Sequence, residues 1–337
     1  MQKLTLGIAG LVVLLLIIGF ALPSQSRFVV STTIDAHPAT VFALVNDLRR
    51  TALWSPITEN DPNVHMLYSG PVRGSGATAT WESATAGGGM QMIIQSRPHE
   101  YVETLINGGE PGETRTWFEL GGGHGVTHIN WGFEHDYRLN IVGRYFGLMV
   151  TGVIRRDYQI GLGNLKELAE SLPAADFGDL EIEYLQIEPI QIAYVSTAAA
   201  PQSTATSKAL GAAYFEVLVF IEKHSLQVAG TQLSIARSFS GAERRFDAGI
   251  PVRGVSETTP QSDGRVRIGK TYGGAVIRVT HVGEYGRLYE THRKIAAYLA
   301  ALGIEKSGDA WESYVSDPTE VDDRQLLTYV YYPIREP

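Results

Sequence analysis

The chain opens on an unbroken apolar stretch. Residues 4–22 are all apolar, glycine or threonine, and as a helix these nineteen residues would extend roughly 28 Å, close to the roughly 30 Å hydrocarbon core of a bilayer. Because Lys3 precedes them, the positive-inside tendency predicts a cytoplasmic amino terminus, with everything from Pro23 onward outside. The competing interpretation is a cleaved secretory signal, but residues 20–24 lack a clean small-x-small cleavage site. We therefore expect an uncleaved, single-pass membrane anchor over residues 1–26.

A strand pattern follows the anchor and gives way to a long helical one. Residues 27–34 predict a strand, and Pro38 suits the first turn of a short helix. Several runs then alternate with period two, and glycine-rich turns such as residues 121–123 separate them. Strands without intervening helices indicate an antiparallel sheet. From residue 141 to residue 172 the apolar positions return at helical intervals, which predicts one long helix.

This order carries a family resemblance. Residues 29–36, Asn46-Asp47 with Trp54-Ser55-Pro56, and residues 157–166 resemble the START-like SRPBCC superfamily of polyketide cyclase/dehydrase type, over residues 27–172. The resemblance implies a helix-grip fold, in which a hydrophobic ligand lies between a curved sheet and the long helix. Trp81 and Trp131 each share one strand face with other apolar residues, so we expect them in the core or the cavity wall.

A linker at residues 173–179 precedes a second domain, residues 180–337. Its pattern reads as two strand–helix–strand halves, with helices over residues 208–224 and 285–302. Such a duplication predicts a pseudo-twofold α+β domain with a groove where the halves meet. The fold class of the whole chain is therefore α+β: a transmembrane helix, a helix-grip domain, then a duplicated domain.

Four ordered motifs in this domain carry a second resemblance. They occupy residues 246–252, 279–285, 311–318 and 327–334, and they resemble the GyrI-like, or AraC-type, effector-binding domain. The resemblance implies a central groove that binds small molecules, often lipophilic cations, with an acidic residue among aromatics. In transcription regulators a DNA-reading module precedes this domain; here an anchor and a lipid-binding-like domain take that place.

The third motif sets one acid between two large aromatics, Trp311-Glu312-Ser313-Tyr314. A carboxylate beside ring faces suits an organic cation, since charge and ring quadrupole both attract it. Glu312 fits the family pattern best, and the expected ligand-binding walls are Trp311, Tyr314, Tyr285 and Tyr329. Some relatives are hydrolases that use a glutamate and a tyrosine, so catalysis by Glu312 with Tyr314 or Tyr329 is the alternative, as is a cyclase-like activity in the first domain.

Composition narrows the partners. The net charge is −8 and there is no long basic run, which argues against nucleic acid. The chain has no cysteine, so disulfides and thiolate chemistry are excluded. His124 and His128 lie on a predicted strand, where four residues span roughly 13 Å, too far to chelate one metal ion. We expect no metal and no cofactor, and a small hydrophobic or cationic ligand as partner of two extracytoplasmic domains. Protein partners stay open.

Overall fold

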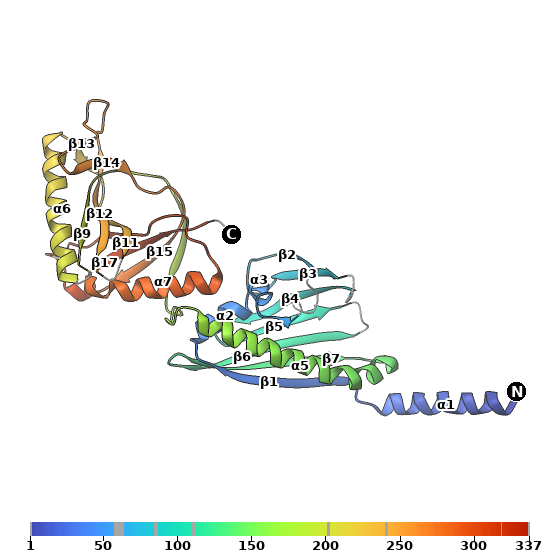
Figure 1. Cartoon of the computed structure of the whole chain (residues 1–337). Helices are drawn as coiled ribbons and strands as arrows, with labels where there is room; N and C mark the ends of the chain where they lie inside the picture. The colour runs from blue at the N-terminus through green and yellow to red at the C-terminus, as the bar shows by residue number, and fades with distance from the viewer. Residues whose placement is uncertain are drawn as a thin grey trace. The chain divides into compact units, whose positions relative to one another are not determined.

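The computed structural model describes residues 2–56, 64–83, 87–108, 112–200, 203–239, 242–317 and 319–335. Pro318 of the third motif lies outside these residues. The chain divides into two compact units, Met1–Gly178 with Ala300–Gly303, and Asp179–Leu299 with Ile304–Pro337. Each unit combines an antiparallel sheet with helices (Figure 1), so the predicted α+β class is confirmed.

The first unit is built on a seven-stranded antiparallel sheet in the order β1-β7-β6-β5-β4-β3-β2. The return of β1 beside β7 joins the two ends of the domain's sequence, with Gln25 opposite Asp136 and Ile34 opposite Thr127. The strands are β1 (Gln25–Ile34), β2 (His65–Ser69), β3 (Thr78–Ser83), β4 (Gly87–Arg97), β5 (Tyr101–Asn107), β6 (Glu113–Gly123) and β7 (Val126–Asp136).

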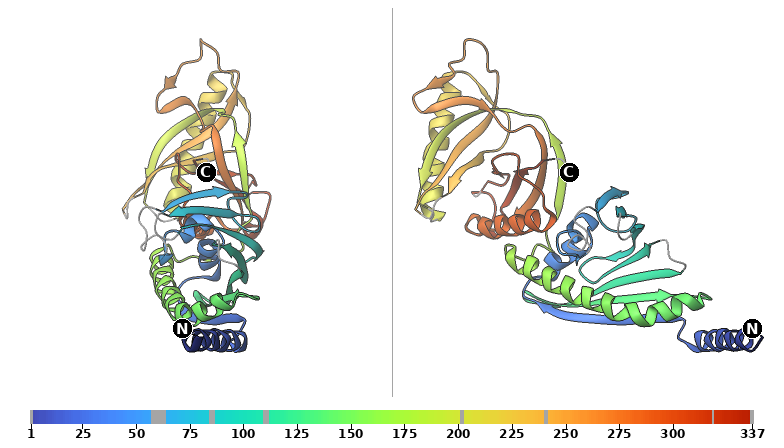
Figure 2. Two further views of the ribbon diagram at one scale, coloured as in Figure 1. Left: turned by 90° about the vertical axis from the view of Figure 1, so that its right-hand side faces the viewer. Right: turned by 45° about the vertical axis from the view of Figure 1, so that its right-hand side comes forward.

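Three helices cover one face of this sheet: α2 (Pro38–Val45), α3 (Leu48–Thr51) and α5 (Ile141–Ser171). The long helix predicted over residues 141–172 is α5, which runs along the sheet (Figures 1 and 2). Asn140 starts it, because its side chain accepts a hydrogen bond from the Gly143 amide at 2.9 Å. The core between helices and sheet includes Leu44, Ile93 and Leu165, all fully buried.

The β6–β7 hairpin differs from its prediction. Residues 121–123 were expected to form a turn, but β6 continues to Gly123 and the chain reverses at His124 and Gly125, with φ of 54° and 84°. The glycines permit a tight hairpin end, since a Cβ on Gly122 would lie 2.3 Å from the Val126 carbonyl oxygen. His124 is therefore a turn residue rather than a strand residue, and His128 lies on β7.

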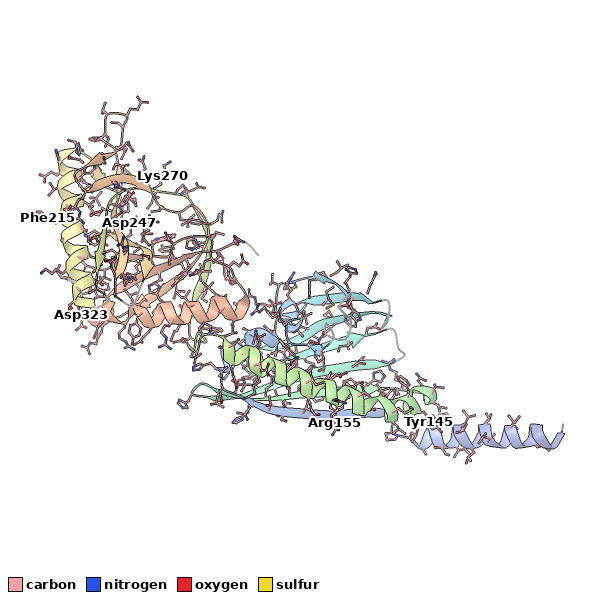
Figure 3. The ribbon with its side chains drawn as sticks, viewed as in Figure 1. Tyr145, Arg155, Phe215, Asp247, Lys270 and Asp323 are labelled. Atoms are coloured by element: carbon pink, nitrogen blue, oxygen red, sulfur yellow. The ribbon has the colours of Figure 1, made fainter. Side chains whose placement is uncertain are left out.

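The apolar amino-terminal segment forms helix α1, Gln2–Ala21. It contacts the start of α5, where the Tyr145 hydroxyl donates a hydrogen bond to the Leu15 carbonyl oxygen at 2.6 Å (Figure 3). Among the described residues one helix is long and apolar enough to cross a membrane, Thr204–Lys223, whereas the apolar helix at the amino terminus, Leu6–Ala21, is shorter. A membrane-spanning role for α1 therefore stays a prediction.

The second unit contains a ten-stranded antiparallel sheet. Nine strands follow the order β13-β14-β9-β12-β11-β16-β17-β15-β8, and β10 pairs with β12. The strands are β8 (Ile182–Ile187), β9 (Gln191–Ala199), β10 (Gln227–Val228), β11 (Leu233–Phe239), β12 (Arg244–Arg253), β13 (Ser262–Asp263), β14 (Val266–Lys270), β15 (Gly274–Val282), β16 (Trp311–Tyr314) and β17 (Leu327–Pro333).

Each half of this sheet carries its own helix. Helix α6 (Ser203–Lys223) packs through Val217 and Phe220 on β9, β12 and β14. Helix α7 (Leu288–Leu302) packs through Ile295 and Leu299 on β15 and β17. The two halves meet at the central strands β11 and β16.

Sheet register shows that both helices lie on the same face. Directly paired residues of neighbouring strands share one face, and one row of pairs crosses from the α6 core to the α7 core. That row is Val195, Ala248, Ser234, Glu312, Val330 and Val279. The opposite face carries a separate core that includes Ile192, Ile235 and Trp311.

Candidate ligand-binding cavities

Strand β16 presents Glu312 on the same face as one large aromatic, Tyr314, and on the opposite face from the other, Trp311. Successive residues of a strand point to opposite sides of the sheet, so Glu312 and Tyr314 face the helices while Trp311 faces away. Trp311 stacks on Tyr331 of β17, with ring centroids 4.7 Å apart and planes 7° apart. Tyr329 lies on that same far face, with the Arg278 guanidinium over its ring at 4.5 Å.

Glu312 is buried, with 3% of its surface exposed, and three side chains bond its carboxylate. Oε1 accepts hydrogen bonds from His292 Nε2 at 2.9 Å and from Arg244 Nη2 at 3.0 Å. Oε2 accepts one from the Tyr314 hydroxyl at 2.5 Å. His292 comes from α7 and Arg244 from β12, so the carboxylate joins both halves of the domain.

These contacts keep the acid ionised. Burial alone raises the pKa of Glu312, but the hydrogen bond and charge of His292, the charge of Arg244 and the Tyr314 hydroxyl together lower the pKa to about 2. Burial, and then the neighbouring charge of Glu312, raise the pKa of Tyr314 well above its usual value. At neutral pH the pair is therefore a carboxylate bonded to a neutral phenol.

A large cavity opens over this carboxylate, with a volume of about 1190 Å³. Its wall combines hydroxyl-bearing rings with apolar side chains from α6 and from the segment after β16. The lining includes Tyr214, Tyr285, Tyr289, Tyr314, Tyr332, Leu210, Leu218 and Val315, and its charged or titratable members besides the tyrosines are Glu312, His292, Arg244 and Asp317. Of the five residues expected here from the sequence, Glu312, Tyr314 and Tyr285 line the cavity, and the lining does not include Trp311 or Tyr329.

The tyrosines are arranged as ring walls as well as hydrogen-bonding groups. Tyr285 meets Tyr314 edge to face, with centroids 5.1 Å apart. Tyr214 on α6 donates a hydrogen bond to the Leu233 carbonyl at 3.0 Å, and the Tyr332 hydroxyl lies 2.8 Å from His292 Nδ1. Because Nε2 of His292 faces a carboxylate, it acts as the donor there.

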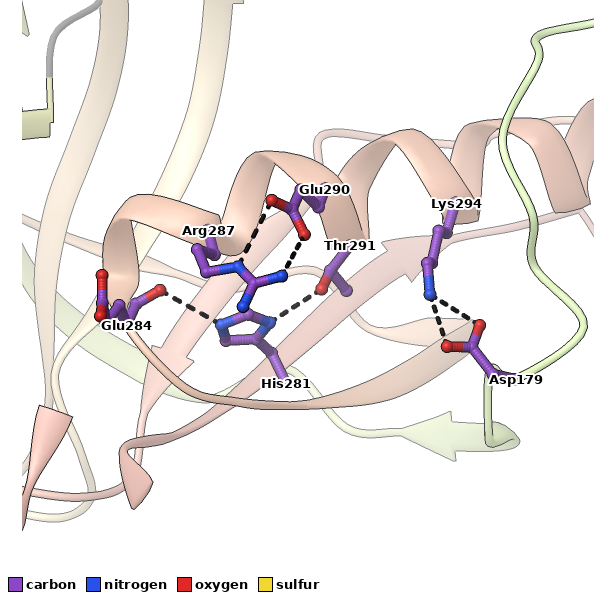
Figure 4. Close-up of polar contacts among 7 residues, drawn as sticks. All are labelled: Asp179, His281, Glu284, Arg287, Glu290, Thr291 and Lys294. Carbon is purple, nitrogen blue, oxygen red and sulfur yellow. Dashed lines mark hydrogen bonds and ion pairs between the residues drawn. The ribbon is translucent and has the colours of Figure 1, made fainter. Parts of the chain in front are cut away.

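A polar cluster holds the start of α7, which carries His292 (Figure 4). Nδ1 of the buried His281 lies 2.8 Å from the Thr291 hydroxyl, and Nε2 lies 3.3 Å from the Glu284 carbonyl. Burial lowers the pKa of His281, and only part of this effect is offset by the Glu284 carbonyl. One helical turn further on, Lys294 bonds the Asp179 carboxylate at 2.7 Å.

The first unit has its own cavity, of about 430 Å³, between α5 and the sheet. Its wall is largely aromatic and apolar, with Phe118, Trp131, Phe133, Phe146, Val150, Ile154 and Tyr158 among the lining residues. Trp131 thus lies where the helix-grip resemblance implied. The lining does not include Trp81, which lies on β3 against Gly89 of β4.

One hydroxyl satisfies the polar atoms of two rings in this cavity. Trp131 Nε1 donates to Thr116 Oγ1 at 2.6 Å, and Thr116 Oγ1 donates to the Gly132 carbonyl at 2.8 Å. Tyr158 stacks on Trp131 with centroids 3.8 Å apart and also hydrogen-bonds Thr116. Burial raises the pKa of Tyr158. The Trp131 wall is therefore held rigidly and its indole N–H is not offered to a ligand.

Four residues that line the Glu312 cavity were not predicted from the sequence: Arg244, His292, Tyr214 and Tyr332. Arg244 begins β12, where two successive arginines carry no apolar strand signal. His292 was one polar residue in a helix assigned by its apolar face. Assigned as a strand, residues 311–314 would separate Glu312 from Trp311 by period-two alternation. Among the described residues no group of three or more His, Asp or Glu side chains could hold a metal ion.

Comparison with known proteins agrees with the two-domain division. Residues 25–170 match the family described as polyketide cyclase / dehydrase and lipid transport. Residues 180–335 match the family described as GyrI-like small molecule binding domain. No curated protein matches the chain.

Several solved structures resemble single domains of the chain. A conserved protein from Listeria innocua is 14% identical, with 46% of this chain and 92% of that chain covered at a TM-score of 0.36. The C-terminal domain of EcmrR is 11% identical, with 47% and 99% covered at 0.39. Truncated norcoclaurine synthase from Thalictrum flavum is 10% identical, with 44% and 94% covered at 0.34. These values are too low to indicate a shared function. The two family matches, in the order and positions that the motifs suggested, place residues 25–170 in the polyketide cyclase / dehydrase and lipid transport family and residues 180–335 in the GyrI-like small molecule binding family.

Proposed function

We propose that this chain is a membrane-anchored small-molecule-binding protein with two separate pockets, one for an apolar ligand and one for an amphipathic or cationic effector. The observation that carries the proposal is the Glu312 cavity, in which a buried, ionised carboxylate lies among tyrosine rings at the junction of two symmetric halves. Ligand pockets are typically about 300–1,000 Å³. The cavity of 430 Å³ falls inside that range, and that of 1190 Å³ lies just above it.

The charge of Glu312 is already shared with Arg244 and His292, which shapes the ligand that the pocket favours. A cation would compete with Arg244, whose side chain is 29% exposed and able to turn toward water. The ring faces of Tyr285 and Tyr314 supply the remaining attraction by cation–π contact. An amphipathic cation therefore fits best, with its charge between the rings and the Glu312 carboxylate and its apolar body against Leu210 and Leu218 of α6.

Binding is favoured over the hydrolase alternative by the same pKa values. A general base works best with a pKa near the operating pH, whereas the pKa of Glu312 is lowered to about 2. The raised pKa of Tyr314 makes its hydroxyl a weak nucleophile at neutral pH. The ionised Glu312 and the neutral Tyr314 are therefore suited to binding a charged ligand.

The proposed location of the two domains relative to the membrane depends on helix α1. We infer that residues 4–22 cross the membrane, with Lys3 on the cytoplasmic side and both domains on the extracytoplasmic side. What supports this is the absence of charge in residues 4–22 and the length of α1 as a twenty-residue helix. Because the chain has no cysteine, Val228→Cys introduces a unique exposed thiol. We expect a membrane-impermeant maleimide to label it from the outside of intact cells; labelling only after lysis would overturn the orientation.

The cation pocket is tested by ligand-induced thermal stabilisation of the full chain in detergent. Tetraphenylphosphonium should raise the unfolding midpoint of the second domain, and the neutral triphenylphosphine oxide should not. The increment should shrink in Glu312→Gln, compared with the midpoint of that variant without ligand. Arg244→Gln removes the competitor for the carboxylate and should bind the cation more tightly. Equal increments in the parent protein and Glu312→Gln would show that the carboxylate does not attract the ligand.

The first pocket is tested by the lipids that copurify with the full chain. Mass spectrometry should detect an apolar ligand in the parent protein. Val150→Trp fills the cavity from α5 and should lose that ligand, while Leu67→Trp, on the exposed strand β2, should retain it. Retention of the ligand by both variants would place it elsewhere.

A further inference from the structure

An apolar stripe lies along the first turns of α5. Val142, Phe146, Met149 and Val153 follow one another at intervals of four, three and four residues, which keeps them on one helix face, and their side chains are 60–78% exposed. Between residues 141 and 154 the sequence has a single charged side chain, Arg144. Proteins that are soluble on their own seldom expose so much contiguous apolar surface.

The guanidinium of Arg144 does not lie on this stripe, because it bonds the carboxyl end of α1. Its guanidinium is buried and donates from Nη1 to the carbonyl oxygens of Phe20 and Leu22, both at 3.2 Å, and from Nη2 to that of Arg138 at 2.7 Å. A cation is stabilised at this position, because the carboxyl end of a helix carries unpaired carbonyls and partial negative charge.

Helix α1 also packs closely on the start of α5. A Cβ on Gly19 would lie 2.2 Å from Ile141 Cγ2, so glycine is needed for this approach. Tyr145 reaches the carbonyl of Leu15, six residues before α1 ends at Ala21. At 1.5 Å per residue these six residues span about 9 Å of α1, a distance that is bridged in part by the length of the Tyr145 side chain. The exposed apolar side chains of α1 therefore end close to where the stripe on α5 begins.

The cavity of the first domain reaches the surface at this stripe. Phe146 lines the cavity and is at the same time 61% exposed. Gly143, Val150 and Ile154 line the cavity beside it on the adjoining strip of α5. An apolar molecule that leaves the cavity past Phe146 would therefore meet apolar side chains and not water.

Basic residues border the stripe at both ends. Arg138 precedes α5; its side chain is 69% exposed, and its Nη2 lies 3.9 Å from a carboxylate oxygen of Glu113. Arg155 and Arg156 follow Val153 and are exposed; Figure 3 shows Arg155 further along α5 than Tyr145. An apolar face with flanking arginines is typical of a helix that lies in the interface of a membrane containing anionic lipids.

We propose that the first turns of α5, residues 141–153, insert into the membrane leaflet that surrounds the carboxyl end of α1, and that the cavity takes up its apolar ligand sideways from this leaflet past Phe146. This rests on the membrane anchoring proposed above. What supports it is the contact of Ile141 and Tyr145 with the carboxyl end of α1, which holds the start of α5 where α1 would leave the bilayer. The partner is the lipid bilayer itself.

The test uses single cysteines labelled with the fluorophore NBD in the full chain, reconstituted in vesicles of phosphatidylcholine and phosphatidylglycerol at a ratio of four to one. Met149→Cys reports on the stripe, Leu14→Cys on α1, and Leu67→Cys on an exposed position of β2 in the same domain. Brominated lipids quench NBD only on contact with acyl chains. We expect at least twofold quenching at positions 14 and 149, and none at position 67.

The outcomes separate the two proposals. Quenching at position 14 without quenching at position 149 overturns the insertion of α5 and leaves the anchor in place. Quenching at neither position overturns both. If position 149 is unquenched but crosslinks to a second copy of the chain, the stripe is a contact between chains and the proposal is wrong.

Uptake is tested with a pyrene-labelled fatty acid placed in the same vesicles and followed by energy transfer from tryptophan. The double variant Val142→Glu/Met149→Glu alters only stripe residues outside the cavity lining, and we expect its rate of uptake to fall at least tenfold. Its equilibrium binding of the fatty acid added from solution should match that of the parent protein. Leu67→Glu is the matched control and should load at the parent rate. An unchanged rate in the double variant would overturn uptake through the stripe.

Discussion

Replacing Glu312 by glutamine should weaken the second domain by removing the charge that joins its two halves. The carboxylate is 3% exposed and bonded by His292, Arg244 and Tyr314. Glutamine keeps the shape but not the charge, and it leaves Arg244 beside a neutral group. Breaking a buried ion pair typically costs about 3–5 kcal/mol. The Arg244 side chain is 29% exposed and can turn toward water, so we expect a smaller loss, about 2–3 kcal/mol at neutral pH.

The pKa of Glu312 leads to the same magnitude. The ordinary value of 4.5 falls to about 2 in the folded protein, and each pH unit corresponds to about 1.4 kcal/mol, so the ionised form contributes about 3 kcal/mol. A lowered pKa means that the unfolded chain binds the proton first as the pH falls. This stabilisation is therefore complete above pH 4.5 and is lost progressively as the pH falls toward 2.

Hydrogen exchange of β16 and β17, followed by mass spectrometry on the full chain in detergent, measures this loss in the second domain alone. A loss of 2–3 kcal/mol should speed the exchange of amides that open only with the domain roughly 30- to 150-fold. Glu183→Gln is the matched control. Glu183 is about half exposed and pairs with Arg278 at 2.7 Å on the sheet edge. The amides of β16 and β17 in Glu183→Gln should therefore exchange at the rate of the parent protein.

The pH dependence supplies the decisive comparison. Between pH 4.5 and pH 3 the parent protein should lose stability faster than Glu312→Gln, because the variant has no carboxylate to protonate at this site. If the variant is as stable as the parent protein at neutral pH and follows the same acid profile, then Glu312 is not an ionised, paired group and the description of the pocket is wrong.

Two further predictions concern other buried polar groups. Thr116→Val leaves the indole N–H of Trp131 and the hydroxyl of Tyr158 without their shared partner, so it should cost the first domain about 1–3 kcal/mol, measured by urea unfolding; Thr116→Ser should restore most of it. His281 has a lowered pKa, so the unfolded chain binds its proton first and stability should fall as the pH drops below 6.5. His281→Gln should abolish that component in thermal unfolding at pH 7.5 and 5.5, and a profile identical to that of the parent protein would contradict the assignment.

The local pattern of apolar and polar residues was sufficient to predict much of the secondary structure. The helix predicted over residues 141–172 ends within one residue of α5, and the strand predicted over residues 27–34 lies within β1. Both segments are long or strictly periodic, so the spacing of their apolar residues predicts which side chains are buried. Strand β16 was not predicted, because four residues between loops carry too short a period to stand out.

The residues that line the Glu312 cavity could be predicted only in part from local pattern. Residue order alone shows an acid and several aromatics close together near the end of the second domain, and a long uncharged segment at the start of the chain. The pairing of the strands is what turns Glu312 and Tyr314 toward the helices and Trp311 toward the opposite core. It also brought His292, twenty residues away, and Arg244, 68 residues away, onto one carboxylate oxygen. The reason is physical: local periodicity reports which residues share a face, whereas strand pairing between distant segments decides which faces meet and which charges they bring together.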